Sequence, residues 1–187
     1  MLMLKQIRLS GFGGQGVILA GSLLGHAAIA EGKWVSGSNA YGAQARGGKA
    51  TSEVVISSQK ISFPHIITTD LLIAFSQSAY NLYKTDLESE QTMVVYDNLL
   101  VKVDHGQKIE QVGIQSTELA LQHFKDKQTA NIILLAAAAA LGEIVSKEAL
   151  EKTINTKVDK RYIELNLKAL TLGYNLGEEI QSGRNRS

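Results

Sequence analysis

Seven residues near the N-terminus, Ser10-Gly11-Phe12-Gly13-Gly14-Gln15-Gly16, have the composition and spacing of a ligand-binding turn. Gly11, Gly13 and Gly16 match the pattern G-x-G-x-x-G, in which glycines permit a tight turn and a close approach of the backbone to a ligand. If a helix follows, its first backbone N–H groups favour an anion above the turn. Gly11, Gly13, Gly14, Gln15 and Gly16 are therefore candidate contacts to a ligand or to a partner's cofactor. A purely structural turn is the alternative.

The segments on either side of this turn predict a strand and a helix. Ile7 and Leu9 alternate with Gln6 and Arg8, which is typical of a strand with one buried face. Residues 17–30 contain no charge and no proline, which predicts a buried helix. Strand, turn and helix together resemble the first βα unit of a nucleotide-binding-type fold.

The rest of the chain alternates between strand-like and helix-like segments. Further strands are expected at 34–36, 51–57, 60–63 (as a hairpin partner or edge), 71–75, 92–96 and 108–114. Further helices are expected from Ser76 or Ser78 to about 88, at 117–124 capped by Ser116, at 130–141, at 147–153 capped by Ser146, and at about 160–181. The apolar run 71–75 is typical of the centre of a parallel sheet.

This alternation predicts one three-layer α/β/α domain, Rossmann-like, with a mostly parallel, mixed sheet. The domain is expected to span residues 1–181, followed by a flexible tail at 182–187. A length of 187 residues suits one well-buried domain better than two.

A second glycine-rich stretch, Tyr41-Gly42-Ala43-Gln44-Ala45-Arg46-Gly47-Gly48, belongs to a long loop expected over residues 37–48. Arg46 carries a planar guanidinium that binds a carboxylate or phosphate through two parallel hydrogen bonds. Tyr41, Arg46, Gly47 and Gly48 are therefore further candidate contacts, and Arg46 is the one candidate for a catalytic role. The alternative is that Arg46 pairs with an acid elsewhere and that the glycines only permit turns.

Composition excludes several classes of function. The chain has no cysteine, so it cannot supply disulfides, thiolate zinc ligands, a cysteine nucleophile or an iron–sulfur cluster of its own. Its four histidines have no metal-like spacing, and no metal site is expected. Net charge is +1 with scattered Lys and Arg, which argues against a nucleic-acid partner. The start lacks signal-peptide features and the apolar run 130–142 is too short to span a bilayer, so a cytoplasmic protein without a membrane partner is expected.

Three familiar enzyme patterns are incomplete or missing. The expected second strand ends in Ser36-Gly37-Ser38-Asn39 without the carboxylate that binds ribose hydroxyls in NAD enzymes. A P-loop is excluded because Ala43 and Ala50 stand where glycine and Ser or Thr are needed, and no G-x-S-x-G elbow exists. Asp70 and Asp97 flank buried strands and are interpreted as strand ends.

Taken together, the motifs resemble the gamma subunit of 2-oxoacid:ferredoxin (acceptor) oxidoreductases. The resemblance rests on G-F-G-G-Q-G-V at 11–17, E-G-K at 31–33 and Y-G-A-Q-A-R-G-G at 41–48, and it continues into the final helix. The sequence A-R-G-G is closest to the 2-oxoglutarate type. Ala43-Gln44 departs from the Pro-Glu that family members often carry, so pyruvate, branched-chain and indolepyruvate substrates stay open.

The resemblance implies one subunit of a larger enzyme that oxidatively decarboxylates a 2-oxo acid to its acyl-coenzyme A. Thiamine diphosphate, magnesium and iron–sulfur clusters would then belong to partner subunits, and ferredoxin would take the electrons. No cofactor is expected to bind this chain alone, and the isolated chain is expected to be inactive. Our hypothesis places Gly13–Gly16 and Arg46 toward the substrate or the coenzyme A path. The alternatives are a non-catalytic assembly subunit and a stand-alone Rossmann-like nucleotide-binding protein.

Overall fold

The computed structural model describes residues 3–42, 47–87, 92–106 and 108–184. The strands are β1 (Leu4–Phe12), β2 (Trp34–Tyr41), β3 (Lys49–Ser57), β4 (Leu71–Ala74), β5 (Met93–Asp97) and β6 (Glu110–Ile114). The α-helices are α1 (Val17–Ala30), α2 (Gln77–Tyr83), α3 (Ser116–Phe124), α4 (Ala130–Leu141), α5 (Lys147–Lys157) and α6 (Ile163–Arg184). Short 3₁₀ turns, η1 (Lys84–Asp86), η2 (Lys127–Thr129) and η3 (Lys160–Tyr162), connect some of them.

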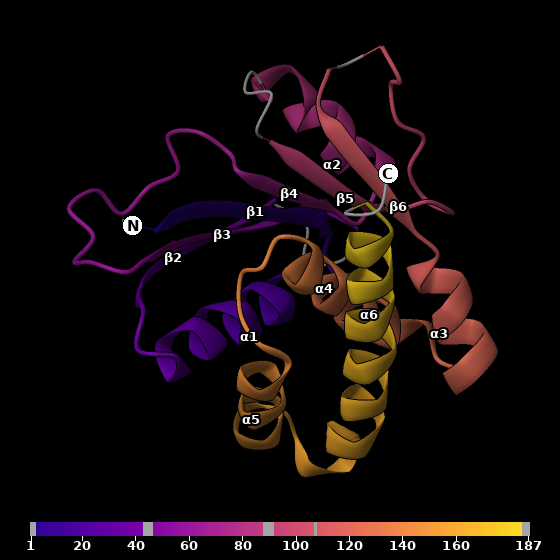
Figure 1. The fold of residues 1–187 in the computed structure, drawn as a ribbon. Coiled ribbons are helices and arrows are strands. Elements are labelled where there is room, and N and C mark those ends of the chain that lie inside the picture. The colour runs from indigo at the N-terminus through magenta and orange to yellow at the C-terminus, as the bar shows by residue number, and fades with distance from the viewer. Residues whose placement is uncertain (1–2, 43–46, 88–91, 107, 185–187) are drawn as a thin grey trace.

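The six strands form one mixed sheet in the order β2-β3-β1-β4-β5-β6 (Figure 1). The pairings β1–β4, β4–β5 and β5–β6 are parallel, whereas β3 runs antiparallel to both β1 and β2. The predicted single α/β domain with a mostly parallel, mixed sheet is therefore confirmed. The apolar run at 71–74 lies between two parallel neighbours, as expected for a central strand.

Two hydrophobic cores lie on opposite faces of this sheet. The larger one joins Ile7, Leu9 and Ile73 to α1, α4, α5 and α6, which cover one face (Figure 1). The smaller one joins Leu72 and Val94 to Tyr80 of α2 on the other face. Neighbouring residues of β4 thus serve different cores, because successive side chains of a strand point to opposite faces.

Two helices on the main face, α4 and α6, pack at very short range. A Cβ on Gly173 would lie 2.3 Å from the backbone carbonyl oxygen of Ile133, and one on Gly177 would lie 2.6 Å from that of Ala137. Gly173 and Gly177 of α6 therefore lie directly against the backbone of α4, and a side chain at either position would prevent this approach. No helix in the described part of the chain is long and apolar enough to cross a membrane.

Two predictions for the first antiparallel strands were wrong. The stretch 60–63 is not a strand, because β3 already pairs with β2 on one side and β1 on the other and offers no free edge. Side chains anchor this connection instead: Ser36 Oγ donates to the Pro64 carbonyl, and Gln6 Oε1 accepts from the backbone N–H of Ile67. Residues 37–41 are not loop but the second half of β2, whose exposed side chains give no alternation to detect.

Two of the three N-caps predicted from the sequence are present in the structure. Ser76 and Ser146 accept hydrogen bonds from the backbone N–H groups of Ala79 and Ala149, as predicted. Ser116 does not cap α3; it is the first residue of the helix and its hydroxyl donates to Asp97. Helix α2 is shorter than predicted and ends at Tyr83, α5 is longer, and α6 continues to Arg184.

Candidate ligand site at the glycine loop

The glycine loop Gly13–Gly16 lies at the carboxyl end of β1, beside the carboxyl ends of β4 and β5. From β1 the chain passes through α1 to β2 and β3 on one side of the sheet and returns to β4 on the other. The loop therefore stands at the point where strand order reverses, which is where open α/β sheets bind ligands.

The Gln15 side chain closes the loop from within. Its Oε1 accepts a hydrogen bond of 2.7 Å from the Phe12 N–H, and its Nε2 donates one of 2.8 Å to the Phe75 carbonyl. Gly11 makes room for this clasp, since a Cβ there would lie 2.6 Å from Gln15 Oε1 and 2.8 Å from the Phe75 Cβ. Both residues are positioned to hold the ends of β1 and β4 together.

Gly14 and Gly16 are the loop residues that require a positive φ. Gly14 has φ of 97° and no atom within 4 Å of where a Cβ would stand. Gly16 has φ of 74° and is the N-cap of α1, a helix with no side-chain cap and no acidic residue in its first turn. The first turn of α1 therefore keeps backbone donors that no side chain satisfies, an arrangement that suits an anion.

Asn131, in the first turn of α4, contacts this turn through its polar side chain. Its Nδ2 faces the Gly16 carbonyl at 3.5 Å, and a Cβ on Gly16 would collide with it. The residue is only 7% exposed, yet its Oδ1 has no hydrogen-bond partner. Because a buried acceptor without a partner costs about 1–3 kcal/mol, Asn131 is set up to accept a hydrogen bond from a ligand.

The second glycine-rich stretch lies directly against the first. The Gly13 N–H donates to the Gly48 carbonyl at 2.7 Å, and the Gly47 N–H reaches the Gly13 carbonyl at 3.5 Å. Tyr41 stands at the end of β2 with 70% of its surface exposed. Arg46 lies outside the described residues, so its role stays a prediction.

A groove of about 860 Å³ opens between the glycine loop and the ends of β5 and α3. Its apolar lining includes Leu99, Leu100 and Leu121, all substantially exposed, and Lys125 and Lys127 also line it. A smaller pocket of about 240 Å³ continues past Gly16 and Asn131 toward α6. An apolar surface, two cations, an open helix start and an orphan amide oxygen together suit an elongated ligand with anionic and amide groups.

Asp97 lines this groove but is fully engaged in holding the scaffold. Its Oδ2 accepts hydrogen bonds from the Ser116 hydroxyl and from the Thr117 N–H and hydroxyl, at 2.5–2.8 Å, and its Oδ1 accepts from the Leu99 N–H. Asp97 thus supplies the cap that Ser116 was expected to give. Asp70 binds the Gln6 N–H at 2.6 Å, so both aspartates act as the strand ends that the sequence indicated.

Within the described residues, no cluster of His, Asp and Glu could hold a metal ion. His26 contacts Ser22 in its own helix, and His65 packs edge-on against Phe63.

Comparison with known proteins identifies the family of the chain. Residues 6–176 match the family model described as pyruvate ferredoxin/flavodoxin oxidoreductase. The chain belongs to this family. A 2-oxoglutarate synthase subunit KorC from Methanocaldococcus jannaschii is 44% identical over 95% of this chain and 96% of its own. The predicted relationship to gamma subunits of 2-oxoacid:ferredoxin oxidoreductases is confirmed.

Two solved structures show how the gamma-type domain occurs in the family. A keto/oxoacid ferredoxin oxidoreductase gamma subunit from Geobacter sulfurreducens superposes with a TM-score of 0.80 at 36% identity, over 92% of this chain and 98% of its own. A 2-oxoglutarate:ferredoxin oxidoreductase from Magnetococcus marinus, solved with 2-oxoglutarate, coenzyme A and succinyl-CoA bound, superposes with a TM-score of 0.85 at 26% identity. The match covers 94% of this chain but only 31% of the M. marinus chain, so in that enzyme the domain is part of a longer polypeptide.

The gamma subunit described here is thus one part of a multi-subunit oxidoreductase. Of its predicted contacts, Gly13, Gly14, Gln15, Gly16, Gly47 and Gly48 are brought together at one end of the sheet. Sequence reasoning missed Asn131, although it is the only polar side chain in the otherwise apolar helix ANIILLAAAAAL. That isolation within an apolar run was the available signal.

Proposed function

We propose that this gamma subunit serves a 2-oxoglutarate:ferredoxin oxidoreductase and that its groove binds coenzyme A. In the overall reaction 2-oxoglutarate and coenzyme A give succinyl-CoA, carbon dioxide, a proton and two electrons, which pass singly to ferredoxin. Support for the substrate comes from the 2-oxoglutarate synthase relative and from the ligands named for the M. marinus enzyme.

Thiamine diphosphate, magnesium and iron–sulfur clusters are assigned in this proposal to partner subunits. The residues of this chain do not fit them, because it has no cysteine and its described part has no metal-ligating cluster. A thiamine cofactor supplies the carbanion chemistry of decarboxylation when bound to its own subunit. What this chain contributes is a surface that receives the acyl acceptor.

The single observation that carries the proposal is the orphaned Oδ1 of Asn131 beside the uncapped start of α1. Coenzyme A carries phosphate groups and an arm with amide N–H donors. The phosphates suit the Gly16 turn and the lysines of the groove, and an amide N–H satisfies Asn131. A nicotinamide dinucleotide fits less well, since no carboxylate follows β2 to bind its ribose.

The test is Asn131→Ala in the assembled enzyme. Loss of one ligand hydrogen bond should raise KM for coenzyme A about tenfold, with little change in KM for 2-oxoglutarate. Asn155→Ala, an exposed residue of α5, is the matched control and should change neither constant. An unchanged coenzyme A KM in Asn131→Ala would remove the groove from the coenzyme A path.

Arg46→Ala separates the proposed role from that of an assembly subunit. Altered coenzyme A or oxo-acid kinetics in an intact complex supports a ligand-facing loop. Dissociation of the subunit, with normal kinetics in whatever complex survives, supports docking alone. Calorimetry of the isolated chain with NAD(H) and ATP tests the stand-alone nucleotide-binding alternative, and we expect no binding of either.

A further inference from the structure

Within the described residues, the outer strand β2 leaves a long sheet edge without the usual protection. Its eight residues, WVSGSNAY, include no charge and no proline. Natural edge strands are normally kept from pairing by shortness, charged side chains, proline or bulges. The opposite edge follows that rule: β6 has five residues and begins with Glu110, which forms an ion pair of 2.6 Å with Arg184. The β2 edge is therefore the one suited to pairing with another strand.

The free backbone groups of this edge belong to alternate residues. The Gly42 N–H donates to the Lys49 carbonyl at 2.6 Å, so even-numbered residues of this strand point their backbone groups toward β3. The N–H and C=O groups of Val35, Gly37, Asn39 and Tyr41 accordingly point outward, because hydrogen-bonding direction alternates along an antiparallel ladder.

We propose that β2 pairs antiparallel with β2 of a second copy of this chain, joining the two sheets across a two-fold axis at Ser38. A two-fold axis perpendicular to the sheet requires that residues opposite each other in the two β2 strands have side chains on the same face of the sheet. It also requires that the outward backbone N–H and C=O groups of one strand lie opposite those of the other. The register centred on Ser38 satisfies both conditions and uses every outward group, with Val35 opposite Tyr41 and Gly37 opposite Asn39 of the second copy. The register centred on Gly37 leaves Tyr41 beyond the end of the partner strand.

Side chains agree with this register. A Cβ on Gly25 of α1 would lie 3.4 Å from Val35 Cγ1, so Val35 and the residues in phase with it stand on the α1 face. The exposed ring of Tyr41 would then cover Val35 of the second copy, an aromatic–β-branched pair of the kind that stabilises antiparallel strands. No two charges are brought together within the paired strands.

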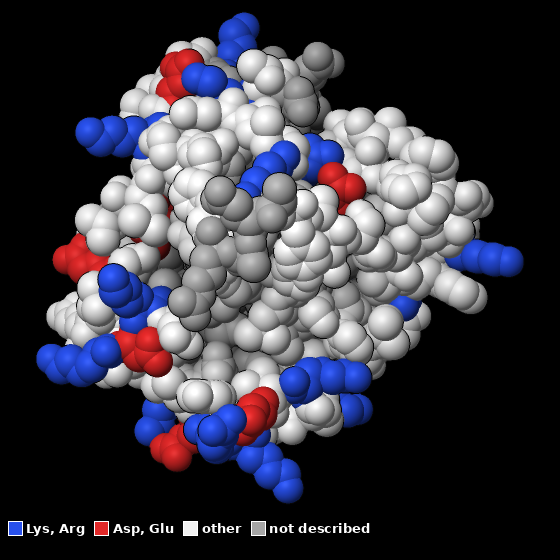
Figure 2. Space-filling view, turned by 180° about the vertical axis from the view of Figure 1, so that it is seen from behind, with Lys and Arg blue, Asp and Glu red and all other residues white. Residues whose placement is uncertain are grey.

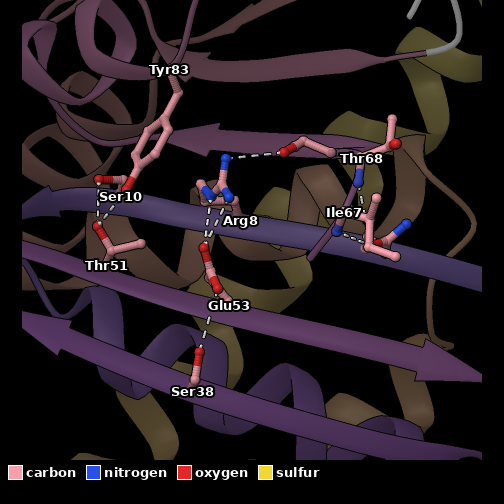
Figure 3. A network of polar contacts seen from close by, with 10 residues as sticks. Arg8, Ser10, Ser38, Thr51, Glu53, Ile67, Thr68 and Tyr83 are labelled. Carbon is pink, nitrogen blue, oxygen red and sulfur yellow. Dashed lines mark hydrogen bonds and ion pairs between the residues drawn. The ribbon is translucent and has the colours of Figure 1, made fainter. Parts of the chain in front are cut away.

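The surroundings of the edge are also uncharged or neutralised. Helix α1 packs on β2 and β3 and contains no Lys, Arg, Asp or Glu, and its exposed positions include Leu19 and Ile29. On the opposite face Ser38 reaches Glu53, whose carboxylate is held by Arg8 at 2.9 Å (Figure 3). Figure 2 shows the molecule from behind, and the upper right of that view has few charged side chains. A second copy therefore meets a surface on which like charges do not oppose pairing.

The absence of cysteine makes the register directly testable. Facing residues that exchange no hydrogen bonds have Cα atoms about 4.5 Å apart, within the range of a disulfide. Mild oxidation of the full chain carrying Ser38→Cys should give a disulfide-linked dimer. Ser36→Cys is the control on the same face of the strand, and its two copies would lie about 13 Å apart, too far to link.

Sedimentation equilibrium of the full chain measures the dimer itself. Asn39→Pro removes an outward donor but none of the ladder to β3, so it should keep the circular dichroism spectrum and raise the dimer dissociation constant at least about tenfold. Asn39→Ala should leave that constant unchanged. A wild-type chain that stays monomeric at about 100 micromolar, a concentration at which even a weak specific dimer would form, overturns the proposal.

Two cross-linking results would also overturn it. One is equal linking by Ser36→Cys and Ser38→Cys, since only the second position faces its own copy across the axis. The other is a disulfide from the Ser38→Cys variant to a different subunit in the purified oxidoreductase. Either result leaves the coenzyme A assignment untouched, because that assignment depends on the groove beside β4 and β5, on the opposite side of β1 from β2.

Discussion

Replacement of Gln15 by glutamate tests whether the side-chain clasp holds the glycine loop. The two side chains have nearly the same shape, and one carboxylate oxygen still accepts from the Phe12 N–H. The other oxygen takes the place of Nε2, which in the wild-type chain donates a hydrogen bond of 2.8 Å to the Phe75 carbonyl. Two acceptors then face each other and the carbonyl loses its donor. Such a loss costs about 1–3 kcal/mol of unfolding free energy.

The loss of unfolding free energy in Gln15→Glu should depend on pH, and this dependence is the sharpest test of the Gln15 contact. Facing a carbonyl favours the protonated carboxyl, so the pKa of the carboxyl group introduced by Gln15→Glu should be raised in the folded protein above its unfolded value of about 4.3. A group of this kind contributes its stability below the unfolded pKa and loses it as pH rises through the folded pKa. The deficit relative to wild type should thus be full at pH 7 and shrink toward pH 4, where the protonated oxygen donates to Phe75.

Urea unfolding of the wild-type chain and the Gln15→Glu variant at pH 7, 5.5 and 4 measures these differences. A deficit of about 2 kcal/mol corresponds to a fall in Tm of about 4–8 °C for a domain of this size. Gln122→Glu, on the exposed surface of α3, is the matched control and should cost less than about 0.5 kcal/mol at each pH. Equal stability of the two variants at pH 7, or a deficit that does not change with pH, would refute the clasp.

Two further predictions concern packing and the contact between α1 and the start of α5. Gly173→Ala should lower the free energy of unfolding by at least about 2 kcal/mol, measured by urea unfolding, because the new Cβ meets backbone that cannot move aside. Gly183→Ala in the same helix is the control. It should leave the free energy of unfolding unchanged, because no atom lies within 4 Å of the new Cβ. Burial tends to raise the pKa of Glu31, but hydrogen bonds from Lys33 and the Ser146 N–H outweigh it and hold that pKa below its ordinary value. A group whose pKa is lowered by folding stabilises the folded state above its unfolded pKa, and this stabilisation is lost on acidification. Glu31→Gln should therefore lower the free energy of unfolding by about 1 kcal/mol at pH 7 and match wild type near pH 3, as measured by urea unfolding.

Much of the fold could be predicted because local pattern and global structure agree there. The charge-free run that forms α1, the apolar run of β4 and the alanine-rich α4 all lie where the sequence indicated. The wrong predictions fall where pairing decides the outcome. Nothing local in 60–63 reveals that β3 already has two neighbours, and the exposed half of β2 has no buried face to set an alternation.

The cap of α3 shows the same limit at a single residue. Ser116 precedes the predicted helix 117–124 and has the side chain of a good cap, so the sequence favoured it. Asp97, at the end of β5, accepts the Thr117 N–H at the helix start with a carboxylate, and charge-assisted hydrogen bonds are stronger than those of a neutral hydroxyl. Whether Ser116 or Asp97 caps α3 depends on the relative positions of β5 and α3, and these positions cannot be predicted from the spacing of the residues in the sequence.

The glycine motif itself divides into two kinds of residue that its spacing alone does not distinguish. Gly11 and Gln15 fit the pattern of a ligand-binding turn, yet their contacts point inward, to the ends of β1 and β4. Gly14 faces the groove, and Gly16 lies against Asn131 at a helix start that no side chain caps. The acceptor beside this second pair, Asn131, comes from α4, more than a hundred residues away. Substitutions at the inward pair should therefore change stability first and kinetics second, and substitutions at Asn131 should do the reverse, which makes the two halves of one motif separable by experiment.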